Sequence, residues 1–187
     1  MTDNPTAEEQ DLKPLEIKNA LIKETQCNYG YELLTGKTKG DVVNRKGAHL
    51  VHEDLENAFK ELDVFIAHID GAFVSFANNQ TPIQELEEKE ELSKYHVFGF
   101  KFSGSEENKS VIFQGEKYTP HGTISFNTPK IKLENTTYLY VEELQVRLNN
   151  CIEEVELYMD GKAAPQLEQM HMDFASEDDA FEQGKVE

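Results

Sequence analysis

The sequence has little sulfur and no long apolar run. Its two cysteines, Cys27 and Cys151, are far apart and fit no metal-ligand spacing, which argues against a disulfide framework and suits a reducing compartment. No stretch approaches the roughly 18 apolar residues of a membrane span. No apolar segment with basic flanks lies near residue 1, so we expect no signal peptide and a cytoplasmic location.

Basic residues are also scarce. The chain has 18 Lys and Arg against 36 Asp and Glu, a net charge of −18, which argues against broad non-specific binding of nucleic acid. The charge is unevenly spread, because residues 92–133 carry six basic and three acidic side chains. One segment is therefore basic. The acidic residues are concentrated near the two ends of the chain and in residues 77–91 and 134–160.

The motifs of catalysis and of metal binding are missing. Residues 36–38 read Gly-Lys-Thr but lack the earlier glycine of a phosphate-binding loop. His49 and His52 have no Cys or carboxylate set to complete a zinc site, and the Glu-rich run 85–91 lacks the glycine of a calcium loop. Residues 103–105 do not form a nucleophile elbow. We expect no enzyme, no cofactor and no metal.

Five segments have the alternation or β-rich composition of strands. They are residues 15–22, 28–34, 95–102, 110–118 and 123–126, with a further short strand near 42–43. Short turns separate the last three strands, which indicates an antiparallel meander.

Two segments have the apolar spacing of amphipathic helices. The first spans residues 53–69 and ends before Gly71, and the second spans 137–160 and ends before Gly161. Their apolar stripes are Leu55, Phe59, Leu62, Ile66 and Ile69, and Val141, Leu144, Leu148, Cys151, Val155 and Tyr158. The second stripe suits packing on a sheet, and self-association through helix 137–160 is the alternative.

These elements predict an α+β fold with an antiparallel sheet of about five strands and two helices. Gly99 and Gly115 would mark bends or bulges, which leaves open a partly closed, OB-like barrel. We expect one domain over residues 14–162, with a mobile acidic loop at 77–94. Residues 1–13 and 163–187 are acidic and poor in core-forming side chains, so we expect them to be disordered.

The basic segment is also rich in aromatic residues. Phe98, Phe100 and Phe102 share one face if the strand alternates regularly, and that face is either core or a surface on which the bases of a single strand stack. Lysines nearby would contact phosphates. The candidate nucleic-acid-binding residues are Lys37, Lys39, Arg45, Lys46, Phe98, Phe100, Lys101, Lys109, Phe113, Lys117, Lys130 and Lys132.

The end of the chain places phenylalanines within a run of carboxylates. Residues 172–174 read Met-Asp-Phe and residues 178–181 read Asp-Asp-Ala-Phe. This segment resembles the acidic C-terminal tip of single-stranded DNA-binding proteins, although six residues follow Phe181. The resemblance implies docking of replication or recombination proteins, and competition with DNA, through Asp173, Phe174, Asp178, Asp179 and Phe181.

The layout of residues 50–164 resembles small tailed-bacteriophage proteins of no assigned activity. Four segments carry this resemblance: residues 50–55, 111–115, 126–129 and 154–162. It implies a role in phage DNA metabolism, in the cytoplasm of the host cell.

The sequence therefore favours an accessory protein of DNA replication or recombination that binds single-stranded DNA and carries a docking or self-inhibiting tail. The alternative is an acidic protein-binding module, or a DNA-mimic inhibitor of a host enzyme, with no affinity for nucleic acid. Lysines that converge on one face beside exposed rings would favour the first function, and dispersed lysines with buried rings would favour the second.

Overall fold

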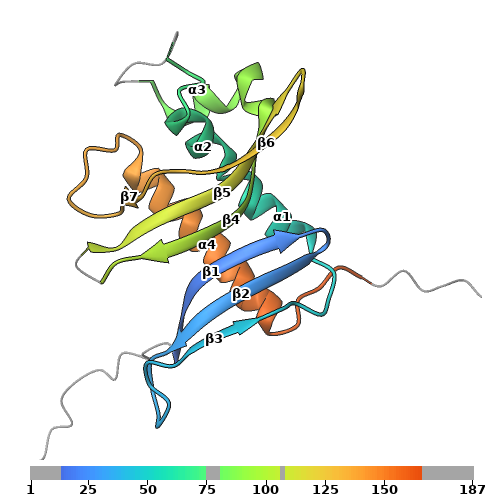
Figure 1. Ribbon diagram of the computed structural model, residues 1–187, viewed down its shortest axis with the longest axis vertical. Coiled ribbons are helices and arrows are strands. Elements are labelled where there is room, and N and C mark those ends of the chain that lie inside the picture. The colour runs from blue at the N-terminus through green and yellow to red at the C-terminus, as the bar shows by residue number, and fades with distance from the viewer. Residues whose placement is uncertain (1–13, 75–80, 106–107, 166–187) are drawn as a thin grey trace, which may run out of the picture.

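The computed structural model describes residues 14–74, 81–105 and 108–165, which form an antiparallel sheet under a layer of helices (Figure 1). The strands are β1 (Leu15–Lys23), β2 (Gln26–Leu33), β3 (Val42–Arg45), β4 (Tyr95–Ser103), β5 (Ser110–Thr119), β6 (Gly122–Asn127) and β7 (Ile131–Lys132). Their order is β3-β2-β1-β4-β5-β6, with β7 also paired to β5. The antiparallel sheet and its separate helices confirm the α+β class. The sheet is open, so it does not form a closed barrel.

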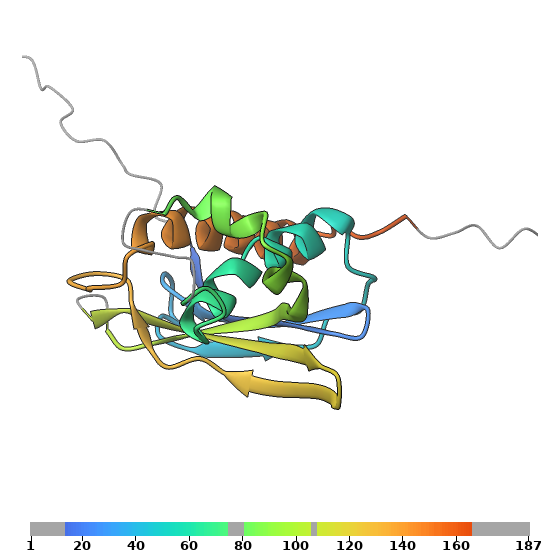
Figure 2. The ribbon, with the colours of Figure 1, turned by 90° about the horizontal axis from the view of Figure 1, so that it is seen from above.

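The helices lie on one face of the sheet, and the other face is uncovered (Figure 2). They are α1 (Glu53–Lys60), α2 (Asp63–Ile69), α3 (Ile83–Glu87), the 3-10 helix η1 (Glu90–Lys94) and α4 (Val141–Met159). The longest, α4, crosses behind β1 and β2 and contacts both strands.

The core lies between the two layers. Ala20 of β1 is opposite both Tyr29 of β2 and Phe100 of β4, and Phe100 is opposite Phe113 of β5. This row of buried side chains meets the apolar stripe of α4, in which Leu144, Leu148, Cys151, Val155 and Tyr158 are buried. The stripe packs inward, as ordinary packing on a sheet requires, so it is not available to a partner helix.

The single helix expected over residues 53–69 is two helices, which meet at Glu61 and Leu62. The N–H groups of Leu62 and Phe65 bond carbonyls only three residues back, so the chain tightens at the junction. Neither Gly nor Pro explains the break. A tertiary contact lies at the same place, because the side chain of Asp63 accepts a hydrogen bond from Val97 of β4.

Residues 81–94, within the loop expected at 77–94, hold α3 and η1. Ile83 and Leu86 of α3 are fully buried, so this part of the segment is anchored to the core despite its many glutamates. Arg147 of α4 also bonds Glu87 and the carbonyl of Glu61, which ties α3 to the helical layer.

A bulge interrupts β4 where the sequence suggested a bend. Val97 is opposite Gly115 and Gly99 is opposite Gln114, so Phe98 is the extra residue. The bulge inverts the alternation, and Phe98 therefore does not share a face with Phe100 and Phe102. Gly115 pairs with Val97 beside this shift and is not an extra residue itself, and its missing side chain leaves room for the Ile66 side chain of α2.

Candidate nucleic-acid interface

The uncovered face of the sheet carries two rows of side chains that cross five strands. Residues directly opposite in an antiparallel pair share a face, and both rows alternate with the buried row of Ala20 and Phe100. One row consists of Asn44, Gly30, Asn19, Lys101 and Ile112, and the next of Asn28, Leu21, Gly99, Gln114 and Asn127. We call these ten residues the open-face band.

Amides dominate this band. It holds five Asn or Gln side chains and one charge, that of Lys101. None of the five amides forms a side-chain hydrogen bond with another residue in the described part of the chain. Each amide has donors and acceptors to offer a ligand.

Two positions of the band are glycines, over which neighbouring side chains lie. A Cβ on Gly30 would collide with the amide groups of Asn19 and Asn44, which converge above it. A Cβ on Gly99 would collide with the ends of Leu21 and Gln114. The neighbouring side chains therefore lean over bare backbone at both positions.

Charge is segregated between the two layers. The described helices carry 13 acidic and three basic side chains, whereas the described strands carry three acidic and six basic ones. The overall charge of −18 thus conceals a sheet with an excess of basic residues.

The predicted basic residues do not all converge. Lys101, Lys130 and Lys132 are exposed, and the pairing of Lys132 with Ser110 puts it on the uncovered face with Lys101. Lys37 and Lys39 are exposed between β2 and β3, and Lys46 follows β3. Arg45 is opposite Tyr29, a core residue, so it stands on the helix side.

Three cations are held within the fold, each by one carboxylate and one ring. Lys109 pairs with Glu16 beside Phe102, Lys117 pairs with Asp70 beside Tyr95, and Arg147 pairs with Glu87 beside Phe65. Lys109 and Lys117 were predicted to contact phosphates, but their ammonium groups are already engaged. The same contacts act on the carboxyls: burial raises their pKa values, and the bound lysines outweigh it, so the pKa values of Glu16 and Asp70 are lowered.

The predicted stacking rings are core residues. Phe100 and Phe113 are 1% and 0% exposed, and Phe100 packs on Phe59 of α1 with ring centroids 5.9 Å apart. Their rings point away from the uncovered face and are closed to a base. Phe98 is half-buried in the bulge. The expectation of base stacking on Phe100 and Phe113 is wrong, because their strand positions face the helices.

The amides of the open-face band were missed. Asn19, Asn28 and Asn44 looked like ordinary polar positions. A signal was present, since Asn28 and Gly30 alternate with Cys27, Tyr29 and Tyr31 along β2, which marks them as one exposed face.

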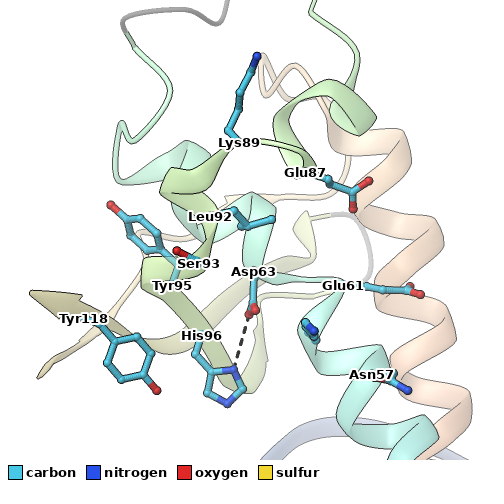
Figure 3. Close-up of a pocket in the computed structure, with 11 residues that line it drawn as sticks. Asn57, Glu61, Asp63, Glu87, Lys89, Leu92, Ser93, Tyr95, His96 and Tyr118 are labelled. Atoms are coloured by element: carbon cyan, nitrogen blue, oxygen red, sulfur yellow. Dashed lines mark ion pairs between the residues drawn. The ribbon is translucent and has the colours of Figure 1, made fainter.

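A pocket of about 890 Å³ opens at the edge of β4, where β1 no longer pairs with it (Figure 3). Asp63 lies at its base and points toward His96, with Oδ1 3.9 Å from Nδ1. At this distance the two side chains form an ion pair when His96 is protonated, and they are too far apart for a hydrogen bond. Asp63 raises the pKa of His96, and burial raises the pKa of the Asp63 carboxyl.

The two histidines of the H-x-x-H pattern take part in hydrogen bonds that stabilise the fold. His52 caps α1 by accepting the N–H of Asp54 at 3.2 Å, and the His49 carbonyl accepts the hydroxyl of Tyr158 at 2.6 Å. In the described part of the chain no group of three or more His, Cys, Asp or Glu side chains is placed to hold a metal ion. Nor is any helix there long and apolar enough to cross a membrane.

The predicted docking residues Asp173, Phe174, Asp178, Asp179 and Phe181 lie outside the described residues. Comparison with known proteins gives no match to a family model, to a curated protein or to a solved structure.

Proposed function

We propose that the open-face band binds single-stranded DNA through amides and lysines rather than through stacked rings. The observation that supports this is the band of five amides without side-chain hydrogen bonds around Lys101, on the layer that carries an excess of basic residues. Asn and Gln can hydrogen-bond base edges, and lysines can pair with phosphates. Such a protein would serve DNA replication or recombination, in keeping with the resemblance to phage proteins.

The acidic C-terminal segment is the natural competitor in this proposal. Residues 166–187 contain seven acidic side chains and one basic one, and carboxylates can occupy the same lysines as phosphates. The segment would hold the band until DNA displaces it, or would dock replication or recombination proteins once it is free.

Anisotropy of a labelled oligo-dT tests the proposal in the full chain. With about three or four phosphate contacts, log affinity should fall with log salt with a slope of about −2 to −3. Lys101→Ala should weaken binding about fivefold, whereas Lys94→Ala on the helical layer serves as the matched control and should change little.

Two further variants separate the parts of the proposal. Asn19→Leu with Asn44→Leu removes amides without changing charge, and should weaken binding at unchanged salt slope. Asp178→Asn with Asp179→Asn should tighten binding if the tail competes with DNA. Full-length and tail-neutralised proteins that both leave the probe free at micromolar concentration would refute DNA binding by this face.

A second function is favoured by one specific observation, the 13 acidic against three basic side chains of the helices. That layer would suit docking on a basic protein surface, including the DNA-binding cleft of an enzyme. In this case Glu142→Lys with Glu143→Lys on α4 would abolish inhibition of the enzyme, and Lys101→Ala would not.

A further inference from the structure

β6 differs from every other described element in carrying no charge. It is the only described helix or strand without Asp, Glu, Lys or Arg, and the uncharged run extends from residue 118 to residue 129. Charged residues make up 29% of the chain. The uncharged run nevertheless includes the strand at the end of the strand order, where charged residues are common.

The position of β6 leaves one side of its backbone free. It pairs with β5 through residues 122–127, and among the described residues no strand pairs with its other side. Five of its six residues are exposed, including Ile124 at 55%. Edge strands in monomeric proteins are usually protected by charge, proline or a bulge, because free N–H and C=O groups invite another strand.

The opposite edge of the sheet has that protection. β3 is only four residues long, ends in Arg45 and is followed by Lys46. The Asp41 carbonyl and the Leu33 N–H also close the turn before it. The two ends of the described strand order are therefore built differently, and β6 lacks the charged residues that protect β3.

We propose that β6 pairs with β6 of a second copy of this chain, in an antiparallel and two-fold symmetric arrangement. Two chains that each carry −18 repel one another, so pairing of two identical strands is opposed least where the strand has no charge, and β6 is such a strand. A partner of opposite charge would be expected to bind a charged strand instead.

The faces of β6 select the register. Ile124 is opposite Lys117 and Phe126 is opposite Gly115, so both point to the helix side, whereas Ser125 is opposite Glu116. Apolar residues match when Ile124 faces Phe126 of the other copy, which places Ser125 opposite Ser125 at the two-fold axis. Gly122, the first residue of β6, has a φ of 135° next to the turn and stays outside this register.

This arrangement goes beyond DNA binding and does not depend on it. A two-fold axis between antiparallel strands is perpendicular to the sheet, so both helical layers lie on one side. The two uncovered faces then form one continuous surface, twice as wide as that of a single chain.

Light scattering on the full chain, without nucleic acid, measures the mass as concentration rises. We expect it to climb from 21.4 kDa toward twice that value. Ser125→Glu would bring four carboxylates into one row, from Glu116 of each copy and the two new side chains, and should raise the dimer dissociation constant at least about tenfold. Val42→Glu on β3, which is 58% exposed, is the matched control and should leave it within about twofold.

Charge complementation separates a lost interface from a lost fold. Equimolar Ser125→Glu and Ser125→Lys chains should form a mixed dimer, since opposite charges then face each other at the axis. A wild-type chain that stays at 21.4 kDa up to high micromolar concentration, or a dimer indifferent to Ser125→Glu, overturns the proposal. Neither result depends on whether DNA binds.

Discussion

The carboxylate of Asp63 accepts a hydrogen bond of 2.6 Å from the backbone N–H of Val97. Asp63 is the first residue of α2, and Val97 lies in the part of β4 that β1 does not reach, since β1 pairs with β4 only from Gly99 to Lys101. A side chain from the helical layer thus satisfies a strand donor that has no strand partner.

Replacing Asp63 tests this connection. Asp63→Ala leaves a buried N–H without an acceptor and should lower the free energy of unfolding by about 1–3 kcal/mol in a urea titration. Asp63→Asn retains an acceptor oxygen and should cost less. An equal loss in both variants would mean that charge, rather than the hydrogen bond, matters at this site.

The same carboxylate should govern the titration of His96. Its pKa is raised above 6.5 chiefly by Asp63, so protonated His96 stabilises the folded state below pH 6.5, and this contribution disappears as pH rises through the raised pKa. In Asp63→Asn the pKa measured by NMR should fall, and the stability between pH 6 and 8 should depend less on pH. A His96 pKa that does not move would show that the two groups are uncoupled.

Glycine substitutions should separate binding from stability. The obstacles to a Cβ at Gly30 are the ends of two Asn side chains, whereas at Gly115 they include the backbone carbonyl of His96. Gly30→Ala should therefore fold normally but displace the amides and weaken oligo-dT binding. Gly115→Ala should lower the melting temperature markedly, because backbone must move. A cost at Gly30 equal to that at Gly115 would contradict this distinction.

Truncation of the buried rings should affect the fold and not the interface. Phe100→Ala and Phe113→Ala should each destabilise the protein by about 3–5 kcal/mol in chemical denaturation. The fraction that remains folded should bind oligo-dT as the wild type does. A loss of affinity without a loss of stability would restore the stacking hypothesis.

The two thiols should be inert in the folded chain. Cys27 and Cys151 are both buried and free, and burial raises the pKa of Cys27 to about 12 and that of Cys151 well above its usual value. Because the thiolate is the reactive form, Ellman's reagent at pH 8 should label neither residue until denaturant is added. Rapid labelling of one thiol in native protein would place it in a looser part of the core than its burial indicates.

Local sequence patterns predicted the strands and both apolar stripes well. Leu55, Phe59, Leu62 and Ile66 are buried as their spacing required, because periodicity reports directly which side of an element meets the core. The fold class followed from the same patterns and from short connections between strands.

The features that the sequence did not predict depend on contacts between residues far apart in the chain. The extra residue Phe98 shifts the register of β4. The rings of Phe98 and Phe100 therefore do not lie on one face, as they would in a regular strand. Lys109 meets Glu16, and Lys117 meets Asp70, only after folding. A count of lysines along the chain therefore overstates the basic charge that a ligand can reach.

The described helices carry 13 acidic and three basic side chains and the described strands carry three acidic and six basic ones, so we expect the described part of the chain to have an electric dipole moment whose positive end lies toward the sheet. In the field of a polyanion such a dipole experiences a torque that turns the sheet forward before contact. The torque acts within about one Debye length, roughly 8 Å at physiological ionic strength. If the sheet binds DNA as proposed, a chain with an overall negative charge would approach it in a preferred orientation, and added salt should slow association more than it speeds dissociation.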